Sequence, residues 1–145
     1  MDTCNVIASP PTLVEVRRVG ERGLGSRGVY ATQTIAPGTV IEHSPVLVLP
    51  KNQVQGESDL AKRAAAISWY VFEWESVSKQ PHVALGLGYL SLYNHAVYSN
   101  ATFERVWPDQ MKIVAVQTIA AGEEVTINYL GDPGIAGDIG FDVKS

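Results

Sequence analysis

Short runs of β-branched and aromatic residues, separated by glycine- and proline-rich turns, constrain the fold of this chain more than any other feature. Such runs are typical of strands, and their close spacing over 145 residues predicts a domain that is mainly β. The spacing favours either a sandwich or a set of small sheets. The predicted strands are residues 12–16, 28–32, 40–49 (one or two strands), 69–75, 82–85, 102–107, 111–117 and 125–129.

Helix is predicted in few places. An alanine-rich segment at residues 59–67 follows Ser58, a plausible N-cap, and is the best helix candidate. Residues 89–93 fit a short helical turn, and residues 50–56 fit a break between elements. A length of 145 residues suits a single domain, so we expect residues 1–145 to form one.

The charge of the chain is unevenly distributed and limits the partners it suits. The net charge is −4, and the surplus lies after residue 120, where five carboxylates accompany Lys144 alone. This acidity disfavours direct binding to a phosphate backbone and suits a basic peptide, whereas a solvated tail that aids solubility is the alternative. We therefore expect no direct nucleic-acid partner.

Cysteine content and hydropathy restrict the compartment and the chemistry. Cys4 is the single cysteine, so a disulfide within the chain and a cysteine-rich zinc cluster are excluded. The three histidines lack a metal-ligand spacing, and we expect no metal site. No run approaches the ~20 apolar residues of a membrane span, and the first residues lack the pattern of a secretory signal. A soluble cytoplasmic protein, or a nuclear one in a eukaryotic host, is the expectation, with no membrane partner.

Three segments point beyond the fold class. The first is Arg22–Ala31, rich in glycine, followed by a proline–glycine turn within Ile35–Glu42. Glycine permits close approach of a ligand to the backbone, although glycine pairs more often mark a plain turn. The second is Gly88–Asn100, which contains Asn94-His95 and Asn100; the alternative for an Asn-His pair is a locally bonded turn.

The third segment is Ala120–Tyr129, which reads as a turn, two glutamates and a strand ending at Tyr129. A buried tyrosine with a bonded hydroxyl is the alternative to a functional one. In order and spacing, the three segments resemble the motifs of the SET domain family. One departure is Ser26, which stands where the family's loop usually has glycine; Gly23-Leu24-Gly25 fits an extension of that loop.

The resemblance implies the SET-domain fold, with several small sheets, a C-terminal pseudoknot and a short helical insert. It covers a core of about residues 12–131, a variable insert at about 51–83 and a short tail at 132–145. It implies a compact member without a pre-SET segment and, because no cysteine follows Cys4, without a zinc-binding post-SET segment. A tail that includes Phe141 would then close the site.

The same resemblance implies a function: transfer of a methyl group from S-adenosylmethionine to the side-chain amine of a lysine on a protein. The substrate would be basic, a histone or histone-like protein, and a homodimer would be one way to complete the peptide groove. The alternative is a SET-fold binding module that has lost catalysis. The resemblance implies that Tyr129 is the catalytic residue. It implies a cofactor site formed by Ser26, Arg27, Gly28, Tyr93, Asn94 and His95, and a substrate channel lined by Tyr89, Tyr70, Trp74 and Tyr129. For Tyr89, Tyr70 and Trp74, packing in the core is the alternative.

Overall fold

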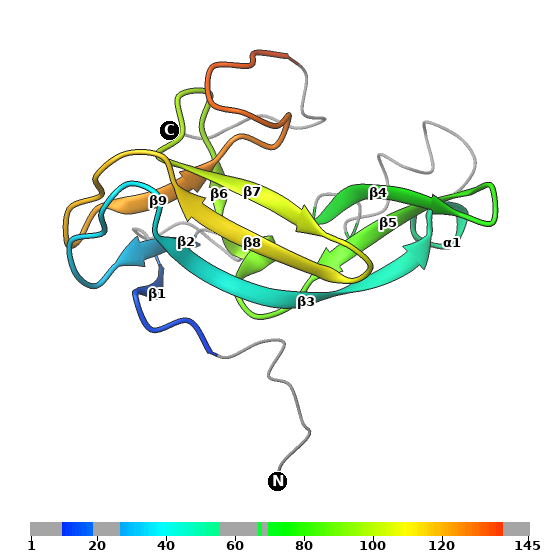
Figure 1. Cartoon of the computed structure of the whole chain (residues 1–145), viewed down its shortest axis with the longest axis horizontal. Helices are drawn as coiled ribbons and strands as arrows, with labels where there is room; N and C mark the ends of the chain where they lie inside the picture. Colours follow the sequence, from blue (N-terminus) through cyan, green and yellow to red (C-terminus); the bar gives the residue numbers. More distant parts are fainter. Residues whose placement is uncertain (1–9, 19–26, 56–66, 68–69, 138–145) are drawn as a thin grey trace, which may run out of the picture.

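Two small sheets form the framework of the fold (Figure 1). The computed structural model describes residues 10–18, 27–55, 67 and 70–137. One sheet has the strand order β1 (Val14–Arg18), β2 (Arg27–Ala31), β9 (Glu124–Ile127) and β6 (Asn94–His95). The other has the order β4 (Val71–Val77), β5 (Gln80–Gly86), β3 (Val40–Pro50), β8 (Gln110–Ala115) and β7 (Ala101–Val106). The helical elements are α1 (Lys51–Gln55) and the 3-10 helix η2 (Leu90–Leu92).

Strand β3 joins two hairpins that lie end to end along it, as Figure 1 shows. Its first part, Val40–Pro45, pairs with β8, and its second part, Val46–Pro50, pairs with β5. Both pairings are antiparallel. Pro45, which has no N–H to donate to a ladder, lies where the strand passes from one partner to the other.

The four-stranded sheet brings together segments that are far apart in the sequence. β2 pairs antiparallel with both β1 and β9, whereas β6 pairs parallel with β9. After β9 the chain returns across the loop that follows β6, and the N–H of Gly134 donates to the carbonyl of Val97 at 2.6 Å. This sheet therefore holds residues from all three sequence motifs.

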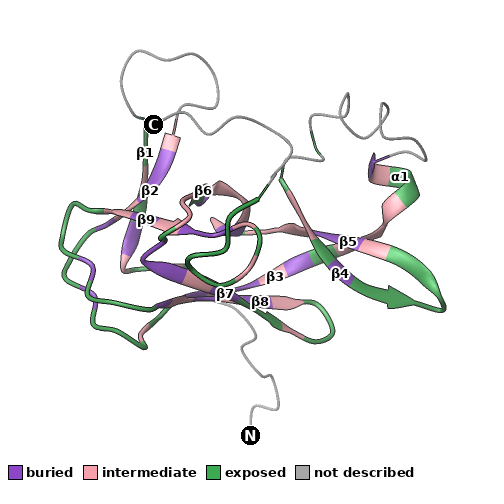
Figure 2. Ribbon diagram, turned by 90° about the horizontal axis from the view of Figure 1, so that it is seen from above, coloured by how far each residue is buried: buried purple, intermediate pink, exposed green. Residues whose placement is uncertain are grey.

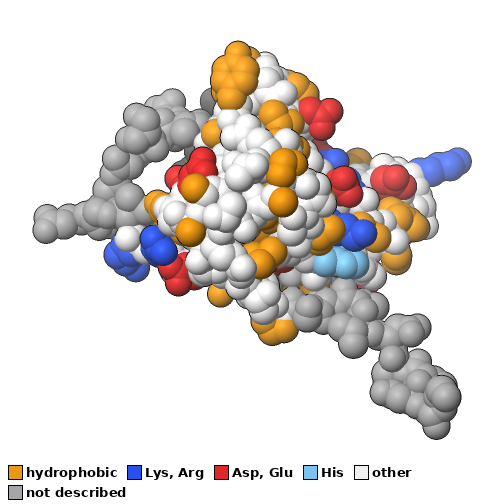
Figure 3. All heavy atoms as spheres, turned by 60° about the vertical axis from the view of Figure 1, so that its left-hand side comes forward, with side chains coloured by type: hydrophobic (Ala, Val, Ile, Leu, Met, Phe, Trp, Pro, Cys, Tyr) orange, Lys and Arg blue, Asp and Glu red, His pale blue; other side chains and the backbone are white. Residues whose placement is uncertain are grey.

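The hydrophobic core lies between the sheets, and strand positions alternate between buried and exposed (Figure 2). This alternation is what a period of two residues produces when one face of a strand is covered. The largest fully buried apolar side chains are Tyr93, Ile35, Leu90, Met111, Ile113, Ile119, Ile127, Val29, Val83 and Val125. The surface in Figure 3 carries acidic and basic side chains interspersed with apolar ones.

The fold confirms the prediction of a mainly β chain with several small sheets. Each predicted strand is present, with ends shifted by at most two residues. The helix predicted at 59–67 lies outside the described residues except for Ile67, and the predicted break at 50–56 instead contains α1. In the described ranges, no helix is long and apolar enough to cross a membrane.

Candidate active site

Tyr129, just beyond β9, is held by residues of the Asn-His motif. Its hydroxyl donates to the carbonyl of Tyr93 at 2.6 Å, and its N–H donates to Nδ1 of His95 at 3.0 Å. The rings of His95 and Tyr129 have centroids 5.1 Å apart. The parallel pairing of β6 with β9 explains this proximity, because it places His95 opposite Ile127. The side chain and main chain of Tyr129 are thus fixed by adjacent residues.

The protonation states of this pair follow from burial. Burial raises the pKa of Tyr129 to about 12, and Tyr70 and the carboxylate of Glu124 add to the rise. Tyr129 is therefore a neutral phenol near pH 7, whose hydroxyl donates a hydrogen bond. Burial lowers the pKa of His95, and its Nδ1 accepts from the N–H of Tyr129, so the neutral ring carries its proton on Nε2.

Asn94 presents one polar atom beyond those already bonded. Its Nδ2 donates to the carbonyl of Arg27 at 2.8 Å and to Oε2 of Glu124 at 2.7 Å. Both amide hydrogens have acceptors, which leaves Oδ1 of this exposed side chain to accept a hydrogen bond from a ligand. The side chain is thus oriented by one residue of β2 and one residue of β9.

Gly28, in β2, allows the carboxylate of Glu124 to approach. A Cβ atom at this position would lie 2.4 Å from Oε2 of Glu124, closer than atoms tolerate. The resemblance to the SET domain family implied that Gly28 lies at the cofactor, where glycine permits close approach, but Glu124 was not singled out. For Glu124, the sequence offered one signal, its place in the segment that ends at Tyr129.

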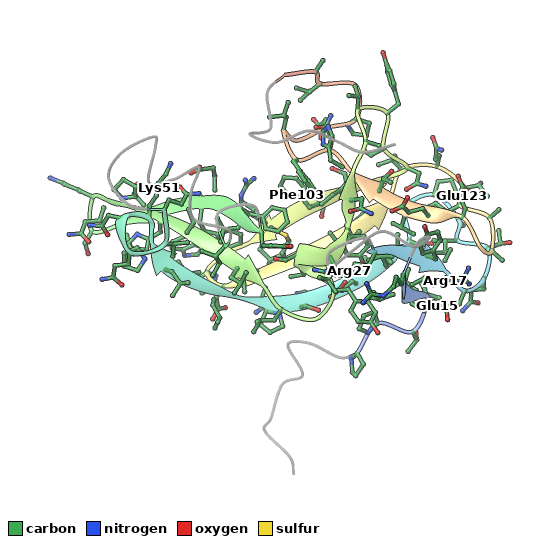
Figure 4. All side chains as sticks on the ribbon, turned by 180° about the vertical axis from the view of Figure 1, so that it is seen from behind. Glu15, Arg17, Arg27, Lys51, Phe103 and Glu123 are labelled. Atoms are coloured by element: carbon green, nitrogen blue, oxygen red, sulfur yellow. The ribbon has the colours of Figure 1, made fainter. Side chains whose placement is uncertain are left out.

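The aromatic residues expected in a channel occupy different surroundings. The ring of Tyr70 lies 6.0 Å from the guanidinium of Arg27, and Tyr70 is 37% exposed. Figure 4 shows Arg27 on the side of the four-stranded sheet, with Lys51 at the far end of β3.

Tyr89 is half-buried and packs against the core. Trp74, in β4, is buried, and its Nε1 donates to the carbonyl of Pro108 at 2.9 Å. Tyr70 is thus placed with Arg27, whereas Trp74 belongs to the core of the five-stranded sheet.

Tyr93 turns its side chain into the core. It is 1% exposed, and its hydroxyl donates to Oε1 of Glu42 at 2.8 Å. Its backbone carbonyl, which accepts from Tyr129, is the part of this residue that belongs to the site. Burial and the carboxylate of Glu42 raise the pKa of Tyr93 well above its usual range. Sequence reasoning missed Glu42, although an acid directly after Val40-Ile41 in a predicted strand was a signal.

Two buried asparagines hold the loops around the site. Asn100 donates from Nδ2 to the carbonyl of Glu124 at 2.8 Å, and its Oδ1 accepts from the N–H of Thr126 at 2.9 Å. Asn128 was not singled out from the sequence; its Nδ2 donates to the carbonyl of Ile135 at 2.8 Å and its Oδ1 accepts from the N–H of Leu130. These bonds fix the segments on either side of Tyr129.

Other expected residues fall outside this arrangement. Ser26 and Phe141 lie outside the described residues. Among the residues that are described, no group of three or more His, Cys, Asp or Glu side chains is placed to hold a metal ion.

Comparison with known proteins finds a matching family and a similar curated protein. The family model described as SET domain matches residues 26–130. A Schizosaccharomyces pombe protein, "Histone-lysine N-methyltransferase, H3 lysine-37 specific", is 31% identical over 125 residues, which cover 86% of this chain and 76% of that protein.

Solved structures of similar fold include two that differ greatly in size. A Plasmodium falciparum protein described as a histone methyltransferase has a TM-score of 0.58 and 21% identity, covering 83% of this chain and 94% of that one. Polycomb Repressive Complex 2 of Chaetomium thermophilum, in an autoinhibited conformation bound to S-adenosylmethionine, has a TM-score of 0.60 and 16% identity. The match covers 83% of this chain but 15% of that chain. At these identities the likeness establishes the fold.

Proposed function

This chain belongs to the SET domain family, and on that premise we propose that it transfers a methyl group from S-adenosylmethionine to the side-chain amine of a lysine on a protein. The observation that carries the proposal is the fixed position of Tyr129, whose hydroxyl and N–H are both bonded to residues 93–95. We propose Tyr129 as the catalytic residue. The domain is proposed to be single, with its core at 12–131, its variable insert at 51–83 and its tail at 132–145.

The polar groups of the site suit S-adenosylmethionine. Oδ1 of Asn94, which accepts no hydrogen bond from the described part of the chain, suits the ammonium group at the amino-acid end of this cofactor. We propose that Arg27, Gly28, Asn94, His95, the carbonyl of Tyr93 and, outside the described residues, Ser26 complete its binding surface. When bound, the cofactor supplies an electrophilic methyl group on a sulfonium.

The residues of the chain orient the reactants rather than remove a proton. Tyr129 has a pKa raised to about 12, so it is a neutral hydrogen-bonding group and a poor base near pH 7. The lysine amine must be neutral to attack, and its ordinary pKa is about 10.4. Burial beside aromatic rings and a positive sulfonium lowers the pKa of that amine. Tyr70 and Tyr129 are proposed to line the channel, together with Tyr89; Trp74 is proposed to support it from the core.

The substrate is proposed to be a basic protein, such as a histone or a histone-like protein. The S. pombe relative acts on histone H3 according to its name, and the acidic surplus of this chain favours a positively charged partner. The cytoplasm, or the nucleus of a eukaryotic host, is the proposed location. A homodimer stays a prediction.

Calorimetric titration of the purified protein with S-adenosylmethionine tests the first half of the proposal. We expect saturable one-to-one binding of the cofactor and of its demethylated product. Labelled methyl transfer onto histone H3 and other basic proteins tests the second half. Binding without transfer to any of them would favour the inactive SET-fold binding module instead, and a folded protein that binds neither compound would contradict the proposal.

A further inference from the structure

We propose that Glu42 is a positioning residue, which through Tyr93 fixes the backbone carbonyl that accepts the hydroxyl of Tyr129. This inference rests on the proposed function, since it gives Glu42 a part in the same reaction. Glu42 does not touch Tyr129. The two are connected through Tyr93, whose side chain bonds Glu42 and whose backbone carbonyl bonds Tyr129.

The carboxylate of Glu42 is buried and fully engaged by nearby donors. Glu42 is 2% exposed. Its Oε1 accepts from the hydroxyl of Tyr93 at 2.8 Å, and its Oε2 accepts from the hydroxyl of Ser44 at 2.7 Å and from the N–H of Tyr89 at 2.9 Å. A buried charge costs much free energy unless such bonds compensate it, so the carboxylate holds its donors firmly.

Two of these donors lie at opposite ends of η2. Tyr89 precedes Leu90 and Tyr93 follows Leu92, so a single carboxylate bonds the residues at both ends of this short helix. The chain closes tightly on the carboxylate at Gly88 as well. There φ is +59°, and a Cβ atom would lie 2.5 Å from Oε2 of Glu42. The segment from Gly88 to Tyr93 is therefore built around Glu42.

The carbonyl at the end of this segment is the one that orients Tyr129. Tyr93 has its side-chain oxygen on Glu42 and its carbonyl oxygen 2.6 Å from the hydroxyl of Tyr129. Without the anchor at Glu42, the backbone of Tyr93 gains freedom, and the hydroxyl of Tyr129 loses a fixed acceptor. Because small displacements at a reacting centre cost large factors in rate, we expect the effect to appear in kcat.

A double-mutant comparison tests the proposal. Tyr93→Phe removes one oxygen atom and is expected to lower kcat by about tenfold, with the KM for the protein substrate changed by less than about twofold. In a Tyr129→Phe background, which already lacks the hydroxyl, the same change should cause no further loss in residual turnover. Tyr98→Phe is the matched control, because Tyr98 is 85% exposed. An equal loss from Tyr93→Phe in both backgrounds would show that Tyr93 and Glu42 are merely structural.

A measurement independent of turnover distinguishes this inference from the proposed function. In protein with ¹³C-labelled tyrosine Cζ atoms, the Tyr129 signal is identified by its loss in Tyr129→Phe. We expect Glu42→Gln and Tyr93→Phe to shift it, and Tyr98→Phe to leave it in place. Shifts without methyl transfer by the unaltered protein would support the arrangement and contradict the proposed reaction. An unmoved signal in folded Tyr93→Phe would overturn the inference even if Glu42→Gln fails to fold.

Discussion

Single residues at this site owe their chemistry to the groups that orient them. A tyrosine is neutral near pH 7, and burial extends that range by raising the pKa of Tyr129 to about 12. Its hydroxyl is directed because the carbonyl of Tyr93 accepts from it. Asn94 offers Oδ1 because its amide hydrogens are used by Arg27 and Glu124. The motifs predicted Tyr129, Asn94 and His95, but not the bonds that Glu42 and Glu124 make to this segment, because those glutamates lie 30 or more residues away from their donors there.

Replacing Tyr129 by phenylalanine tests its assignment as the catalytic residue. We expect turnover to fall by roughly 100-fold, because the reacting groups lose an orienting hydroxyl. Cofactor affinity, measured by calorimetry, should change far less. Equal loss of both would mean that Tyr129 serves only to support the structure.

Replacing Asn94 by alanine tests the cofactor assignment. Loss of the Oδ1 acceptor for an ammonium group should weaken binding of S-adenosylmethionine by about tenfold, which corresponds to ~1.4 kcal/mol. Asn52→Ala is a matched control, because Asn52 is exposed and lies in α1. An affinity unchanged by Asn94→Ala would remove Asn94 from the proposed binding surface.

The pKa of His95 predicts a dependence of stability on pH. Because burial lowers this pKa in the folded protein, the unfolded chain binds the proton more readily. The contribution of His95 to the free energy of unfolding is therefore present above the ordinary pKa of about 6.5 and is lost as the pH falls through the folded value. Urea unfolding between pH 8 and pH 5 should show this decline, and His95→Asn should reduce it. An identical decline in the variant would assign it to other groups.

At the scale of elements, local patterns predict strands well and short pairings poorly. Period-two runs such as Gln110–Ala115 identify themselves, because one face meets the core. β6 has two residues and forms because it pairs with β9, so no local sequence pattern predicts it. The prediction found the helical turn before β6, now seen as η2, and missed the strand that follows.

The contact between β2 and β9 makes Gly28 a sensitive position. Gly28→Ala should lower the free energy of unfolding by about 1 kcal/mol, because a Cβ atom would push the carboxylate of Glu124 away from its hydrogen bond with Asn94. Combining Gly28→Ala with Glu124→Ala should remove most of the added cost of the alanine at position 28. Urea unfolding of the unaltered protein, the two single variants and the double variant measures this. Strictly additive costs would show that the collision is not the cause.

At the scale of the whole molecule, the fold depends on pairing between strands that are far apart in the sequence. β9 lies inside its sheet, between β2 and β6, and supplies the fully buried side chains of Val125 and Ile127. The sequence predicted β9 as a strand, but not which strands flank it, because pairing across such separations leaves no local trace. Contacts of this range also make folding slow compared with that of helical domains.

Removal of residues 124–145 should therefore abolish cooperative unfolding. The truncated chain would leave β2 without one neighbour and β6 without its partner. Thermal unfolding followed by circular dichroism, with the full chain as reference, checks this. A sharp transition in the truncated chain would show that the five-stranded sheet folds on its own.

The two attachments of the segment Asn94–Asn100 to β9 also limit its length. Asn94 pairs with Thr126 at one end, and Asn100 bonds Glu124 and Thr126 at the other. An inserted or deleted residue between these anchors would break one of them. Chain length here is thus as strict a requirement as residue type. This fixed length sets the spacing between Asn94 and Asn100, and the fixed spacing is why the motif can be recognised in a single sequence.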